Sequence, residues 1–153
     1  MEWRDSVRSA VASLLIGLLL LANVASSARP ERLVLIVSAD SKVEQLDSLE
    51  VRKLFLGMTV AHDGVQLRPL LNEADPMVKE VFLQNVVAMT DTSYDRRILR
   101  LALQRGSLLP TVYTDTTKLL NDVAADPTAV SYAWYRNVAL DRKIKVLRVL
   151  WHE

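Results

Sequence analysis

Residues 33–37 read LVLIV, an unbroken run of aliphatic side chains. Strands that are covered on one face alternate apolar with polar residues, whereas strands that are covered on both faces are apolar throughout. The run therefore predicts a central β-strand of an α/β domain, buried on both sides. The polar stretch 38–41 (SADS) is the predicted turn after it.

The sequence after this strand alternates helix signals with strand signals. Asp47 and Glu50 stand three residues apart, as in a capping box, and Gly57 suits the end of that helix. Asp75-Pro76 opens a second helix, with Asp as cap and Pro in the first turn. Two further helices are predicted, one over about 92–105 that ends at Gly106 and one from Thr114 or Asp115 to about Ala125. A further strand is predicted over about 65–71, after the Asp63-Gly64 turn. The remaining predicted strands are 109–113, 129–133 and 144–151. The expected fold class is α/β, a mixed sheet flanked by helices.

Residues 1–28 have the three zones of a signal peptide. Arg4 and Arg8 give a basic start, residues 11–24 are apolar, and Ala25–Ala28 are small. We expect cleavage after Ala28, which leaves residues 29–153 as one exported domain in the periplasm. The alternative is an uncleaved anchor, but a spanning helix needs about 20 apolar residues and this run is shorter. No membrane span is expected after cleavage.

The charge balance argues against nucleic acid as a partner. The chain has 19 basic and 18 acidic residues, and they are interspersed rather than gathered in a stripe. Nucleic-acid-binding domains need a clustered positive surface. The chain also has no cysteine, which excludes disulfides and thiolate catalysis.

No catalytic residue, cofactor or metal ligand is predicted. The chain has no Gly-x-Ser-x-Gly elbow, no P-loop and no His-Glu-x-x-His motif. His62 and His152 are the only histidines, and neither has a partner at metal-ligand spacing. We therefore expect a protein that is not an enzyme.

Three segments resemble a known family. Residues 46–57, LDSLEVRKLFLG, resemble the segment L-S-x-x-x-L-x-x-I-F-x-G of the phosphate-type periplasmic substrate-binding proteins, which belong to the type 2 periplasmic binding protein-like superfamily. Residues 82–87 (FLQNVV) resemble the family's F-x-x-x-V-L helix, and residues 127–132 (PTAVSY) its P-G-A-I-G-Y segment, with Thr128 and Ser131 in place of both glycines. Asp63, Gly64 and Pro69 match as well, although the Trp that the family carries before this position is missing.

The resemblance covers about residues 33–150 and implies a short, single-lobe member of the superfamily. It implies a solute-binding-like protein whose ligand is a small oxyanion or another small solute. It also implies a membrane transporter or an envelope protein as partner. The alternative is a periplasmic interaction or sensory module that has lost solute binding. Trp134, Tyr135 and Trp151 would then form an exposed contact patch, unless they are buried.

The family's anion-binding turn is not preserved. Phosphate binders hold the anion with a Ser-Gly-Thr turn at a helix start, and the corresponding residues here are 72–77, NEADPM. A helix N-terminus attracts anions through its free N–H groups and its dipole. Asp75 would place its own carboxylate there, Pro76 removes one donor and Glu73 repels a phosphate. We therefore expect a degenerate anion site.

Seven polar residues are candidate ligand contacts. Ser38, Asp40 and Ser41 follow the first strand, and ligands of open α/β sheets bind beyond the carboxyl ends of strands. Arg68 is a candidate partner for a ligand carboxylate, or else for Glu73 or Asp75. The full set is Ser38, Asp40, Ser41, Arg68, Asn72, Thr114 and Ser131. The competing interpretation of the serines and threonines is that they only cap helices and turn the chain.

Overall fold

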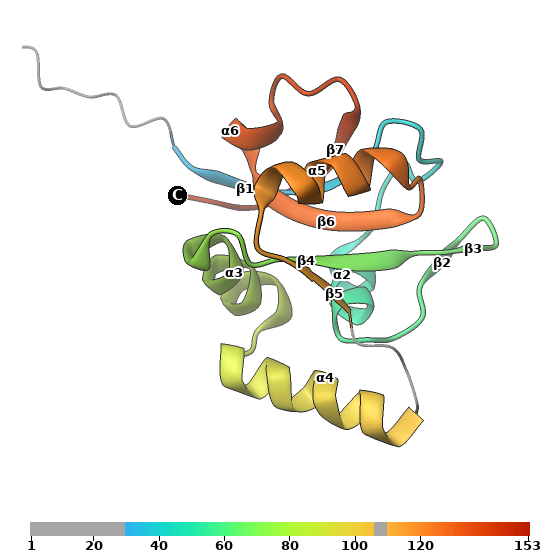
Figure 1. Ribbon diagram of the computed structural model, residues 1–153, viewed down its shortest axis with the longest axis vertical. Coiled ribbons are helices and arrows are strands. Elements are labelled where there is room, and N and C mark those ends of the chain that lie inside the picture. Colours follow the sequence, from blue (N-terminus) through green and yellow to red (C-terminus); the bar gives the residue numbers. More distant parts are fainter. Residues whose placement is uncertain (1–29, 106–109) are drawn as a thin grey trace, which may run out of the picture.

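The structure, a computed structural model, describes residues 30–105 and 110–153 (Figure 1). The strands are β1 (Arg32–Ser38), β2 (Ala61–His62), β3 (Val65–Gln66), β4 (Arg68–Asn72), β5 (Thr111–Tyr113), β6 (Ala129–Trp134) and β7 (Ile144–His152). The helices are α2 (Ser48–Phe55), α3 (Pro76–Phe82), the π-helical turn η1 (Leu83–Val87), α4 (Asp91–Arg105), α5 (Thr116–Ala125) and α6 (Tyr135–Val138). The predicted leader, the predicted helix end at Gly106 and the predicted strand start at Leu109 lie outside the described residues.

The strands form one five-stranded sheet of order β5-β4-β6-β1-β7 and a separate β2–β3 hairpin. Strand β4 is parallel to β5 and to β6, whereas β1 is antiparallel to both β6 and β7. The predicted mixed α/β sheet is therefore confirmed, and β1 is the strand that runs against the other four.

Burial on both faces of β1 is confirmed, because residues 33–37 are fully buried. Leu33, Leu35 and Val37 pack into the core beneath α2, α3 and η1. Val34 and Ile36 pack into a second core beneath α5 and α6. Figure 1 shows these two helical layers on opposite sides of the sheet.

The helix caps follow the sequence signals. Asp47 and Glu50 exchange hydrogen bonds of 2.7 and 2.8 Å with each other's backbone N–H, so the capping box of α2 is confirmed. Gly57 lies just beyond α2 with φ 78°, a left-handed conformation that suits glycine. For α5 the cap is Asp115 rather than Thr114. The turn prediction at Asp63-Gly64 holds, but the strand predicted over 65–71 is divided between β3 and β4.

An aromatic cluster joins three elements beneath the sheet. The rings of Phe82 from α3 and Tyr132 from β6 stack with centroids 3.7 Å apart. Phe55 from α2 meets Phe82 edge-on at 4.8 Å and Tyr132 at 5.5 Å. The three rings come from separate elements, whose backbones hold them in place. Removing one ring would therefore leave a cavity that its neighbours cannot readily fill.

We predict that Phe82→Ala lowers the free energy of unfolding by about 3–5 kcal/mol, the usual range for a fully buried phenylalanine. Chemical denaturation measures the change. The matched control is Leu140→Ala, at a side chain that is 96% exposed; it should change stability by less than about 0.5 kcal/mol. Equal effects of the two substitutions would contradict this account of the core.

Candidate functional site

Four parallel strands, β4, β5, β6 and β7, end at one edge of the sheet. Because β4, β5 and β6 run in the same direction, the chain leaves all three toward the N-termini of α3, α5 and α6. Ligands of open α/β sheets bind outside such carboxyl ends. This carboxyl edge, which comprises residues 72–75, 113–115 and 134–136, is therefore the candidate functional site.

At the carboxyl edge, the carboxylate of Asp75 caps α3. Its Oδ1 accepts a hydrogen bond of 2.8 Å from the backbone N–H of Met77, which confirms the predicted acidic cap. Its Oδ2 accepts a hydrogen bond of 3.0 Å from the indole Nε1 of Trp134. A nitrogen of Arg136 lies 4.0 Å from the same oxygen. A backbone N–H, an indole N–H and a guanidinium thus surround a carboxylate that the chain itself supplies.

Arg136 is committed to further neighbours. It forms an ion pair with Glu31, just before β1. Its guanidinium also lies 5.6 Å from the centre of the Trp134 ring, within cation–π range. The positive charge nearest to Asp75 is therefore shared with a second carboxylate rather than held free for a ligand.

A second set of charged residues lies near the cap of α3. Lys79 donates from Nζ to Glu73 Oε1 at 2.7 Å and to Asp91 Oδ1 at 2.8 Å. Partial burial tends to lower the pKa of Lys79, but the hydrogen bonds to Asp91 and Glu73 outweigh it and leave the pKa raised. The lysine is held as a cation between two carboxylates, so the group carries an excess of negative charge.

Two of the predicted contact residues are bound within the protein near this edge. Asn72 donates 2.9 Å to the carbonyl of Tyr132 and accepts 3.1 Å from the N–H of Ala74, and it is 2% exposed. The hydroxyl of Ser131, fully buried in β6, donates 2.9 Å to the carbonyl of Leu70. Thr114 lies exposed between β5 and the cap of α5.

Three other predicted residues lie at the opposite edge of the sheet. Since β1 is antiparallel to β6, its carboxyl end meets the start of β6, so Ser38, Asp40 and Ser41 lie away from the carboxyl ends of β4, β5 and β6. Ser38 donates 3.0 Å to the carbonyl of Ala124 and accepts from the N–H of Asp40. Ser41 accepts from the N–H of Val43. Both hydroxyls fasten the turn and α5.

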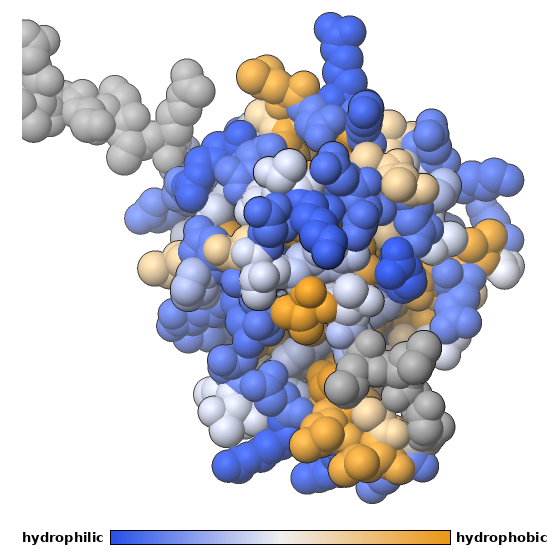
Figure 2. All heavy atoms as spheres, viewed as in Figure 1, coloured by the Kyte–Doolittle hydropathy of each residue, from blue (hydrophilic) through white to orange (hydrophobic). Residues whose placement is uncertain are grey.

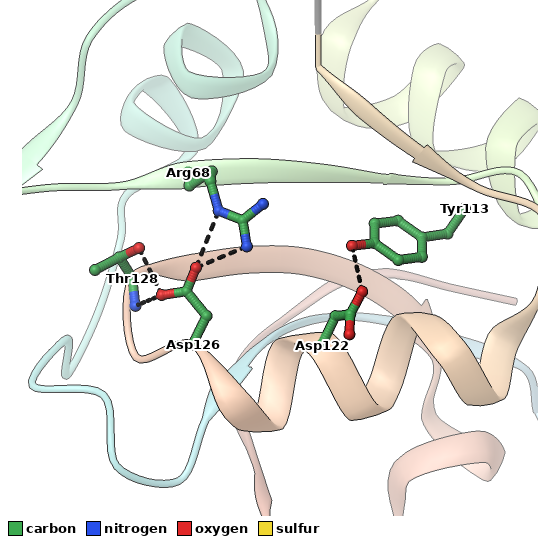
Figure 3. A network of polar contacts seen from close by, with 5 residues as sticks. All are labelled: Arg68, Tyr113, Asp122, Asp126 and Thr128. Atoms are coloured by element: carbon green, nitrogen blue, oxygen red, sulfur yellow. Dashed lines mark hydrogen bonds and ion pairs between the residues drawn. The ribbon is translucent and has the colours of Figure 1, made fainter.

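Arg68 belongs to the same opposite edge (Figure 3). Its Nε and Nη2 donate 2.9 and 2.7 Å to one oxygen of Asp126, so the expected partners Glu73 and Asp75 are wrong. The N–H and hydroxyl of Thr128 donate 2.8 and 2.7 Å to the other oxygen. Burial tends to raise the pKa of Asp126, but the hydrogen bonds from Thr128 and Arg68 outweigh it and leave the pKa lowered.

Sequence reasoning missed the partners of Asp75. Of the two alternatives left open for Trp134, an exposed patch or burial, the structure shows burial: it is 3% exposed and packs with Trp151, their ring centroids 6.2 Å apart. Tyr135 and Trp151 are half-buried. No spacing rule pairs an Asp with a Trp 59 residues further on. Only the parallel alignment of β4 with β6 brings the two together.

Two hollows in the described part of the chain lie away from the carboxyl edge. One of about 680 Å³ is bounded by Leu54, Ile98, Leu101 and Arg68 among others. One of about 600 Å³ lies between residues 45–50, His62 and β7. Asp75 lines neither hollow. The candidate site is therefore defined by the hydrogen-bonding groups around Asp75 and not by a hollow.

Within residues 30–105 and 110–153, no three His, Asp or Glu side chains are arranged to hold a metal ion. Over the same residues, no helix combines the length and the apolar character needed to cross a membrane.

Solved structures share this fold. No protein-family model matches the sequence, and no curated protein matches it. A phosphate transport receptor from Vibrio cholerae superimposes with a TM-score of 0.58 at 13% identity, over 78% of this chain and 46% of the receptor. A possible phosphate-binding protein from Planctomyces limnophilus superimposes with a TM-score of 0.55 at 14% identity, over 78% of this chain and 41% of that protein. A third structure is that of a putative phosphate transporter substrate-binding protein from Clostridium perfringens with bound phosphate. It superimposes with a TM-score of 0.55 at 10% identity, over 78% of this chain and 45% of that protein.

The likeness confirms, at the level of the fold, the resemblance found in the sequence. The chain has the fold of one lobe of a phosphate-type binding protein. It spans less than half the length of these three proteins.

We predict that Asp75→Ala lowers the free energy of unfolding by about 2–4 kcal/mol, because it removes a helix cap and leaves the buried Trp134 N–H unpaired. The matched control is Asp115→Ala on α5. It removes a cap that accepts a hydrogen bond of 2.7 Å from the Lys118 N–H, but it leaves no buried donor without a partner. It should cost about 1 kcal/mol. Equal losses in chemical denaturation would show that the Trp134 bond contributes nothing.

A pH dependence follows from Asp126. Because folding lowers its pKa, Asp126 contributes stability above its unfolded pKa of about 3.9, and this contribution is lost as the pH falls through the folded pKa. Asp126→Asn should therefore lose less stability than the wild type between about pH 6 and pH 3. Urea unfolding at both pH values measures this, with Asp63→Asn in an exposed turn as control. An unchanged pH dependence would refute the assignment.

Proposed function

We propose that this chain is an exported, non-enzymatic, solute-binding-like domain whose anion site at the start of α3 is closed by Asp75. The observation that carries the proposal is the pair of contacts to Asp75, from the Met77 N–H at 2.8 Å and from the Trp134 indole at 3.0 Å. These donors are already bonded to a carboxylate. An incoming phosphate would have to displace that carboxylate and overcome its repulsion.

The proposal that the domain binds solutes rests on the shared fold. The solved structures that resemble this chain are described as phosphate transport or phosphate-binding proteins. By analogy, the domain would present a small solute to a membrane transporter. Thr114 is the proposed contact at the carboxyl edge, because it is exposed and no internal hydrogen bond of its hydroxyl is found among the described residues. Asn72 and Ser131 would contribute only if their internal bonds opened.

The opposite edge supports a weaker site. Ser38, Asp40, Ser41 and Arg68 stay candidate contacts there, but the two serine hydroxyls and the guanidinium already bind protein groups. The Nε–Nη2 edge of Arg68 therefore has to release Asp126 before that edge can hold a ligand carboxylate in a bidentate manner.

A second candidate function is an envelope interaction or sensory module that no longer binds a solute. It is favoured by the same closure, since Asp75, Lys79 and Arg136 are all engaged with groups of the chain itself. The replacements at Thr128 and Ser131 point the same way. Thr128 fixes Asp126 and Ser131 fixes Leu70, so both side chains serve the scaffold rather than a ligand.

Calorimetric titration tests the closed anion site. Inorganic phosphate, sulfate and molybdate should bind the wild-type chain with a dissociation constant weaker than about 1 mM, or not at all. The matched variant is Asp75→Asn, which keeps a good helix cap and removes the charge. Micromolar binding of phosphate by the wild type would overturn the proposal.

The same titrations separate the two functions. Heat with another small solute, abolished by Thr114→Val, supports the solute-binding function. If no solute gives heat while the fold stays intact by circular dichroism, the interaction module is supported instead.

A further inference from the structure

Helix α4 is attached to the domain along a single stripe. Tyr94 and Ile98 are buried, and the Tyr94 hydroxyl donates 2.8 Å to the carbonyl of Phe55. In Figure 1, α4 lies at one end of the molecule, beyond α2 and α3 and apart from the sheet. Its opposite side therefore faces solvent.

That solvent-facing side carries apolar residues. Leu99 and Leu103 are 54% and 78% exposed, and residues four apart project from the same side of a helix. Arg96 and Arg100, also four apart and exposed, form the neighbouring row. Figure 2 shows hydrophobic residues gathered over α4 with hydrophilic residues beside them. We call these four residues the outer face of α4.

The charges of this face are unbalanced. Within the described part of the chain, neither Arg96 nor Arg100 forms an ion pair. Asp91, at the start of α4, is held by Lys79 at 2.8 Å and so does not compensate them. Asp95 is the other acidic residue of the helix. The outer face thus joins two exposed leucines to guanidinium groups that are free to bind an anionic surface.

We propose that the outer face of α4 docks onto an anionic lipid bilayer. The leucines enter the boundary between headgroups and acyl chains, and the arginines bind headgroup phosphates, as in helices that lie on a membrane surface. The shape favours a bilayer over a protein partner, because a helix at the end of the molecule presents a convex ridge. A bilayer accepts a ridge without a matching groove. This inference does not depend on whether the domain binds a solute.

A fluorescent label tests the contact locally. Because the chain has no cysteine, Leu103→Cys supplies a unique attachment point for an environment-sensitive dye such as NBD. In the full chain, we expect a blue shift and stronger emission with vesicles of phosphatidylglycerol and phosphatidylethanolamine, and little change with phosphatidylcholine alone. High salt should weaken the response, since headgroup attraction is screened.

Two further variants make the test specific. Arg96→Gln with Arg100→Gln, in the labelled background, should weaken the response to anionic vesicles about tenfold or more. The matched control carries the dye at Leu140→Cys, an exposed position outside α4 that is followed by Arg142 and Lys143, and it should not respond. The proposal is overturned if Leu103→Cys gives no shift on anionic vesicles. It is also overturned if the shift is equal on phosphatidylcholine, or if the dye responds to an acidic polypeptide and not to lipid.

Discussion

The carboxylate of Asp75 is the interaction on which the candidate site depends. It binds the free backbone N–H of Met77 and the indole N–H of Trp134, with Arg136 at 4.0 Å. The attraction of a helix N-terminus for negative charge is thereby satisfied inside the protein. A buried indole donor that lost this partner would be costly to leave unpaired. The same contact therefore stabilises the fold and, in the proposed function, occupies the place where an anion would bind.

The sheet topology explains why these groups meet and why others do not. Parallel alignment of β4 with β6 brings Asp75 and Trp134 to one edge although they are far apart in sequence. The antiparallel direction of β1 sends Ser38 and Ser41 to the opposite edge, where they fasten a turn and α5. Arg68 and Asp126 join that second edge. The domain thus has polar networks at both ends of its strands, and each is built mainly from contacts within the chain.

Local signals in the sequence predicted the fold well. The apolar run 33–37, the capping box at Asp47 and the Asp75-Pro76 helix start depend on neighbouring residues, so a single sequence reveals them. Pairing over long distance was not accessible in this way. The direction of β1, the Asp126 partner of Arg68 and the burial of Trp134 are fixed by which strands lie side by side, and no spacing pattern encodes that. The short α6 also lacked a signal, and the resemblance of residues 82–87 to a family helix did not reveal the π-helical geometry of η1.

The most direct measurement is the indole N–H resonance of Trp134 in ¹⁵N-labelled protein, assigned with a Trp151→Phe variant. If Asp75 holds this donor, adding inorganic phosphate at neutral pH leaves the resonance in place, while Asp75→Asn moves it. A resonance that shifts in the wild type as phosphate is added would contradict the account, because it would mean that the indole is open to an external anion.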